Sequence, residues 1–132
     1  MSKNKSQQKW DIDLEFGEKG EDFVREILQG NGKIEVKTER DNGSPKQWKT
    51  TGNIAIERTY RGKPSGLSVT EAKTWIHLLT CKGKFEGGFI ISVDDLKKRI
   101  NELYKKKEVR VVMGGDDNAS ELFLVPIDKI FN

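Results

Sequence analysis

The length and composition of the chain exclude several classes of protein. Its 132 residues suffice for one domain with a real core, and equal shares of apolar and charged residues, 34% each, predict a small core under a highly charged surface. The net charge of +3 is too small for the whole-molecule field to indicate a polyanionic partner. The single cysteine, Cys81, excludes an internal disulfide and fits a reducing, cytoplasmic location. The sequence shows neither an apolar run of membrane length nor a signal-peptide pattern, so we expect no membrane partner.

The N-terminal part of the chain predicts a helix after a frayed end. Residues 1–9 are polar and basic, and we expect them to be flexible, with a single domain over residues 10–132. Apolar residues and one glycine then recur at helical spacing, and Gly30 and Gly32 end the pattern. The residues of this stripe are Phe16, Gly20, Phe23, Val24, Ile27 and Leu28.

Two strands with period-two alternation follow, at 33–39 and 52–57. We expect them to pair as a hairpin with their aliphatic sides together. The opposite face then collects Glu35, Lys37 and Glu57. Two carboxylates beside an ammonium group suit a Mg²⁺ site, because Mg²⁺ takes oxygen ligands from a small number of carboxylates.

Basic residues and aromatic residues alternate in the loops on either side of these strands. We expect these loops to contact DNA, with cations on phosphates and aromatic rings on unpaired bases. An ordinary solvated loop is the alternative interpretation. The expected contacts are Lys46, Trp48 and Lys49 in one loop, and Arg58, Arg61 and Lys63 in the other.

The second half of the chain predicts four strands and a helix. We expect strands at 75–79 and 88–93, a helix with the apolar stripe Leu96, Ile100 and Leu103, and strands at 109–113 and 122–125. Ser92 or Asp94 would cap the helix. The whole order is α-β-β-β-β-α-β-β, which defines an α/β protein with a mixed β-sheet.

These motifs together resemble the PD-(D/E)XK, or restriction-endonuclease-like, nuclease superfamily. The resemblance covers residues 16–113 and rests on a Gly-x-x-Gly-Glu helix start that ends at Glu21, the Glu35-Val36-Lys37 strand and the acid-bearing strand that follows it. It implies a restriction-endonuclease-like core and an endonuclease that hydrolyses DNA phosphodiester bonds with Mg²⁺ or Mn²⁺. It also implies a homodimer, because a domain of this size needs a second copy to cut both strands.

The family pattern can be placed on the sequence in two ways. In the preferred one, Glu35 and Glu57 are the two strand acids, and Lys37 replaces the lysine that the family has at the position of Thr59. In the other, Glu35-Val36-Lys37 is the family's acid-x-Lys motif, and the earlier acid is Asp11 or Asp13.

The resemblance assigns a role to each residue of the preferred arrangement. Glu35 and Glu57 would hold the metal ion, and Lys37 would orient the attacking water and stabilise the developing charge. The family also has an acid on its first helix. Glu21 lies at the border of the apolar stripe and is preferred over Glu18, which lies on the far side.

Other interpretations use the same residues without catalysis. Glu35, Lys37 and Glu57 could form a solvated strand face with cross-strand ion pairs. The chain could be a catalytically inactive nucleic-acid-binding module on the same fold, or a structural protein. His77 and Cys81 are expected to be structural. Because no recognition helix is evident, a nuclease would be structure-selective or weakly sequence-specific.

Overall fold

The protein is described by a computed structural model that covers residues 18–30 and 33–131. The chain divides into two compact units, Met1–Gly32 and Lys33–Asn132, and each is described by itself. In the first unit, residues 18–28 are helical, as their apolar spacing predicts, and Gly30 follows the helix end with a φ of 73°. The predicted flexible segment 1–9 and the alternative acids Asp11 and Asp13 lie outside the described residues.

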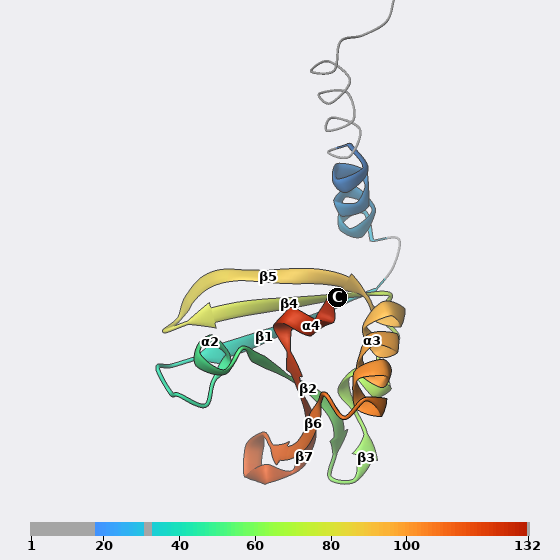
Figure 1. The fold of residues 1–132 in the computed structure, drawn as a ribbon. Helices are drawn as coiled ribbons and strands as arrows, with labels where there is room; N and C mark the ends of the chain where they lie inside the picture. The colour runs from blue at the N-terminus through green and yellow to red at the C-terminus, as the bar shows by residue number, and fades with distance from the viewer. Residues whose placement is uncertain (1–17, 31–32, 132) are drawn as a thin grey trace, which may run out of the picture. The chain divides into compact units, whose positions relative to one another are not determined.

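The second unit contains two β-sheets with helices packed on them, which confirms the predicted α/β class (Figure 1). One sheet is mixed and has the strand order β1-β4-β5. Its strands are β1 (Ile34–Asp41), β4 (Thr74–Cys81) and β5 (Lys84–Ser92). β1 runs parallel to β4, and β5 runs antiparallel to it.

The other sheet is antiparallel, with the order β3-β2-β7-β6. Its strands are β2 (Asn53–Tyr60), β3 (Lys63–Pro64), β6 (Arg110–Gly114) and β7 (Ser120–Pro126). β2 and β3 are joined by Arg61 and Gly62, whose φ angles of 50° and 78° match a two-residue hairpin turn with positive φ at both positions. The strand therefore extends beyond Glu57 to Tyr60, where the sequence had indicated the start of a loop.

One long helix, α3 (Val93–Lys105), supplies much of the apolar packing. The Ser92 hydroxyl accepts a hydrogen bond from the Asp95 backbone N–H at 3.1 Å, so Ser92 is the cap. The short elements are the helices α2 (Trp48–Thr51) and α4 (Ile127–Ile130) and the 3₁₀ turns η1 (Gly66–Ser68) and η2 (Asp116–Asn118). No helix among the described residues is long and apolar enough to cross a membrane.

The core joins both sheets to α3. Leu96, Ile100 and Leu103 are buried, which confirms the predicted apolar stripe of the helix. They belong to one apolar cluster with Ile54 and Ile56 of β2, Trp75 of β4 and Val125 of β7. Because residues from both sheets meet in this cluster, the position of β1 relative to β2 is set by packing of the whole unit.

The predicted hairpin between the strands at 33–39 and 52–57 is wrong. β1 pairs with β4, whereas β2 pairs with β3 and β7. The period-two pattern defines the two faces of each strand, but it does not specify the neighbouring strand. Here the partners come from distant parts of the sequence, because β4 follows β1 by a crossover and β7 lies near the C-terminal end.

The burial of β1 is inverted relative to the usual strand pattern. Its aliphatic residues Ile34 and Val36 are 36% and 52% exposed in the second unit. Glu35, Lys37 and Glu39 lie on the half-buried face. The predicted contact of the two aliphatic sides is therefore also wrong, since Ile54 and Ile56 of β2 are buried against α3 and β4 instead.

Leu96 tests how far the second unit depends on α3. Leu96 is fully buried, so Leu96→Ala removes apolar contacts and leaves a cavity, and we expect the free energy of unfolding to fall by about 2–5 kcal/mol. Urea titration followed by circular dichroism measures this change. Lys98→Ala, an exposed site on the same helix, should stay within about 0.5 kcal/mol of the parent. Equal effects of the two substitutions would contradict this packing.

Candidate functional site

Glu57 is held by two serine hydroxyl groups near the end of β2. Ser65, beside η1, donates to Oε2 at 2.6 Å, and Ser120 of β7 donates to Oε1 at 2.7 Å. These hydrogen bonds, with Ser65 as the larger cause, lower the pKa of Glu57 below its ordinary value, and the positive charge of Lys37 lowers the pKa further. The carboxylate is therefore ionised and fixed in orientation.

The backbone of η1 comes close to Glu57 at Gly66. A Cβ atom at this position would lie 2.5 Å from the Glu57 carbonyl oxygen, and the φ of Gly66 is 54°. Both conditions require glycine here. The close approach allows Ser65, one residue earlier, to reach the carboxylate.

Lys37 pairs with one of the two strand acids that the sequence indicates. Its Nζ is 3.7 Å from Glu35 Oε1. Glu57 lies in the other sheet, where the charge of Lys37 contributes to lowering its pKa. The strands that carry these residues are not paired with each other. The polar face of β1 is turned toward β2, since Glu39 on that face accepts the Ala55 N–H.

Glu39 connects the same face of β1 to β2 and β4. Its Oε1 accepts the Ala55 backbone N–H at 3.0 Å and lies 2.9 Å from His77 Nε2. The Trp75 indole N–H donates to His77 Nδ1 at 3.1 Å, so Nε2 carries the ring proton and donates to Glu39. His77 is 1% exposed with both ring nitrogens bonded, which agrees with a structural role.

Two side chains of the first predicted DNA-contact loop are bonded to other parts of the second unit. The Trp48 indole N–H donates to the Thr80 carbonyl oxygen at 2.8 Å, so this ring is anchored along one edge. Lys49 Nζ lies 2.7 Å from Glu86 Oε1, and this hydrogen bond raises the pKa of Lys49. Lys46 lines a pocket of about 190 Å³ that Glu39 and Trp48 also line.

The three basic residues of the second predicted loop lie in two separate parts of the second unit. Arg61 and Lys63 are exposed at the β2–β3 turn, and the Arg61 guanidinium lies 5.3 Å from the centre of the Tyr60 ring. Arg58 is the residue at the bulge in β2 between Glu57 and Thr59. Its guanidinium lies over Phe123 of β7, 5.5 Å from the ring centre.

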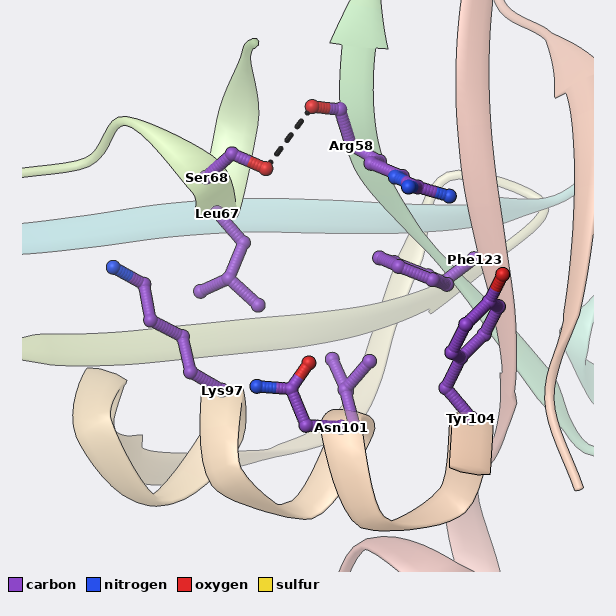
Figure 2. Close-up of a pocket in the computed structure, with 8 residues that line it drawn as sticks. Arg58, Leu67, Ser68, Lys97, Asn101, Tyr104 and Phe123 are labelled. Atoms are coloured by element: carbon purple, nitrogen blue, oxygen red, sulfur yellow. Dashed lines mark hydrogen bonds between the residues drawn. The ribbon is translucent and has the colours of Figure 1, made fainter. Parts of the chain in front are cut away.

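Arg58 faces a pocket of about 340 Å³ between α3 and the strands β2 and β7. Figure 2 shows Lys97, Asn101 and Tyr104 on α3 across from Leu67 and Arg58. Ser68 closes the edge by donating its hydroxyl hydrogen to the Arg58 carbonyl oxygen at 3.1 Å. This pocket was not indicated by the sequence.

Glu21 belongs to the first unit and lies exposed on the helical segment 18–28, as Glu18 does. It therefore stays a prediction as the third acid. Within the described residues, no group of three or more His, Cys, Asp or Glu side chains gathers closely enough to hold a metal ion.

The sequence did not indicate the two serines that bond to Glu57 or the residues of α3 that line the pocket beside Arg58. Ser65 and Ser120 are far apart in the chain, and neither stands in a recognisable motif with Glu57. The spacing i, i+4 and i+7 places three residues on one face of a helix, and the sequence shows this spacing at Lys97, Asn101 and Tyr104. The fold is needed to show which strands and side chains lie opposite that face.

Comparison of the chain with protein-family models, with curated proteins and with solved structures gave no match.

The hydrogen bonds of Glu57 predict how stability depends on pH. Because the folded-state pKa is lower than the ordinary value of 4.5, the unfolded chain takes up the proton first on acidification. The contribution of Glu57 to stability is therefore complete above pH 4.5 and is lost as the pH falls through the folded-state pKa. Ser65→Ala should raise the pKa of Glu57 toward its ordinary value, as measured by NMR titration of the carboxyl carbon.

Ser68→Ala is the matched control for this titration, because Ser68 lies in the same turn and bonds to Arg58 rather than to Glu57. An unchanged pKa in Ser65→Ala, or an equal rise in both variants, would contradict the assigned hydrogen bond.

Proposed function

We propose that the protein is a metal-dependent DNA endonuclease with a restriction-endonuclease-like core of the PD-(D/E)XK type. One observation carries the proposal: the Lys37 ammonium is next to Glu35 and acts on Glu57, which comes from the other sheet. Two carboxylates and a lysine that act on one another are the groups that metal-assisted phosphodiester hydrolysis uses. A solvated strand face would not require Glu57 to be fixed by two further hydroxyl groups.

The donor set fits a hard cation such as Mg²⁺ or Mn²⁺. Glu57 is ionised, and its two hydrogen bonds to serine use two of the roughly four lone-pair sites of a carboxylate. The Glu35 side chain is 34% exposed, so its oxygens are accessible. Glu35 and Glu57 would hold the metal ion, which when bound supplies Lewis acidity and lowers the pKa of a coordinated water.

Lys37 would act on the reacting phosphate. An ammonium group at this place can position the attacking water and stabilise the negative charge that develops on the phosphoryl oxygens. Its ion pair with Glu35 at 3.7 Å keeps the ammonium on the same face of β1 as that carboxylate. Ser65 and Ser120 are positioning residues, because they act through Glu57.

The proposed substrate is DNA in a reducing cytoplasm, bound without strict sequence readout. Exposed cations at the β2–β3 turn, Arg61 and Lys63, can contact phosphates, and Lys46 offers a further charge near the other end of β2. Lys49 contributes less, since Glu86 offsets its charge. A homodimer would place two such sites on the two strands of a duplex.

A catalytically inactive DNA-binding module is the second candidate. It is favoured by the absence, in the described part of the chain, of a third acid or histidine near Glu35 and Glu57. A Mn²⁺ titration by calorimetry separates the two candidates, since the nuclease should bind the ion and lose that binding in Glu57→Gln.

Lys37 provides the direct test of cleavage. We expect Lys37→Ala to retain Mn²⁺ and DNA binding but to cut at least about a hundredfold more slowly, because charge stabilisation at the phosphate is lost. Cleavage of labelled linear, single-stranded and four-way-junction DNA is compared with Mg²⁺, Mn²⁺ or EDTA present. Lys33→Ala, whose lysine pairs with Glu71 on the surface, is the control and should cut at the parental rate. Equal rates in the parent and Lys37→Ala would remove Lys37 from the mechanism.

The two helix acids give a second kinetic prediction. If the first helix supplies the third acid, Glu21→Gln should slow cleavage more than Glu18→Gln, because Glu21 lies at the border of the apolar stripe. Single-turnover rates at saturating Mg²⁺ measure the difference. A larger loss in Glu18→Gln would transfer the role to Glu18, and parental rates in both would exclude this helix from the site.

A further inference from the structure

The pocket beside Arg58 has the dimensions of a small-ligand site. Its volume of about 340 Å³ is near the lower end of the range of about 300–1,000 Å³ for such sites, which suits a ligand the size of one nucleotide. One wall is the face of α3 that carries Lys97, Asn101 and Tyr104 (Figure 2). The opposite wall is formed by Leu67 of η1 and by Arg58.

The charges of the pocket favour an anion. Its lining contains two cations, Arg58 and Lys97, and no acidic residue. Glu121 lies 3.8 Å from Arg58, and within the described part of the chain Lys97 forms no ion pair. The Asn101 amide likewise makes no hydrogen bond to any described residue, so it can donate to and accept from a ligand.

The aromatic residues of the pocket favour a planar group. The Arg58 guanidinium lies 5.5 Å from the centre of Phe123 and 5.9 Å from the centre of Tyr104, and these rings meet edge to face. A guanidinium held over rings in this way offers a flat surface, and unpaired bases stack on such surfaces. Tyr104 is 49% exposed, so part of its ring can also take contacts.

The pocket is next to the carboxylate site. Ser65 binds Glu57, and three residues later Ser68 lines the pocket. At about 2.0 Å per residue in a 3₁₀ turn, these two serines are about 6 Å apart along the turn. Glu57 and Arg58 are consecutive in β2, so their side chains leave opposite faces of the strand, and the turn from Ser65 to Ser68 bonds to both residues. A strand whose phosphate lies at Glu57 can place a neighbouring nucleotide at the pocket where it passes this turn.

We propose that this pocket binds one unpaired nucleotide of the DNA substrate. The base stacks on the guanidinium of Arg58 beside Tyr104, the edge of the base bonds to the Asn101 amide, and the phosphate is neutralised by Lys97. The proposal rests on the proposed nuclease function and specifies its substrate as DNA with an unpaired or frayed nucleotide next to the cut. A paired base has its edge engaged by its partner, so the stacked position requires an unpaired one.

The experiment measures binding separately from cleavage. The full-length protein is titrated, in EDTA, into a fluorescein-labelled single strand and into the same strand annealed to its complement, with fluorescence anisotropy as the readout. Arg58→Lys keeps the charge but removes the planar surface, and we expect its affinity for the single strand to fall about tenfold while duplex affinity stays within about twofold. Lys97→Ala should weaken single-strand binding more than Lys98→Ala, the adjacent exposed lysine outside the pocket.

Each outcome decides the proposal. Addition of deoxyadenosine monophosphate should change the chemical shifts of the Asn101 side-chain amide. Addition of deoxyribose 5-phosphate, which lacks the base, should not, and this pair of results would support the proposal. Equal losses for single strand and duplex in Arg58→Lys, or equal effects of the two lysine substitutions, would overturn it. Selective single-strand binding without Mg²⁺-dependent cleavage would leave the pocket in place and refute the nuclease. Cleavage with no selective effect of Arg58→Lys would refute the pocket alone.

Discussion

The inward-facing polar side of β1 is the constraint on which the rest of the second unit depends. Charged groups that leave water need partners, and unpaired ones are costly. Each inward charge of β1 has one: Lys37 pairs with Glu35, and Glu39 bonds to the Ala55 N–H and His77. Asp41 is buried and accepts the backbone N–H groups of Gly43 and Lys49.

These pairings join the two sheets where no strand ladder does. The Glu39 carboxylate accepts the Ala55 N–H of β2, a hydrogen bond that the carbonyl oxygen of a neighbouring strand would accept in a sheet. The strands β1 and β2 therefore lie close without being paired. Glu57 is oriented separately, by hydrogen bonds from Ser65, which precedes η1, and from Ser120 of β7. Structural cross-links and the candidate chemical groups therefore come from neighbouring positions on the same strands.

Local elements were predictable from the sequence, whereas their partners were not. The stripe of Leu96, Ile100 and Leu103 identified α3, and the alternation around Val36 identified β1, because both signals lie within a few neighbouring residues. The pairing of β1 with β4 and the hydroxyl group of Ser120 on Glu57 depend on contacts between distant parts of the chain. The sequence placed Glu35, Lys37 and Glu57 together through a hairpin that does not exist. In the structure Lys37 pairs with Glu35, and Glu57 lies in the other sheet, where it feels the charge of Lys37.

The bulge in β2 has a consequence for changes in chain length. Because side chains alternate along a strand, one extra or missing residue reverses every position beyond it. Glu57 points toward the serines and Arg58 toward Phe123, as alternation requires of consecutive residues, and the bulge lies between Glu57 and Thr59. An insertion or deletion between Ile56 and Tyr60 would exchange these two directions and alter both places at once. Divergent copies of this chain should therefore vary in length within the loops at 42–47 and 115–119, while the span of β2 stays constant.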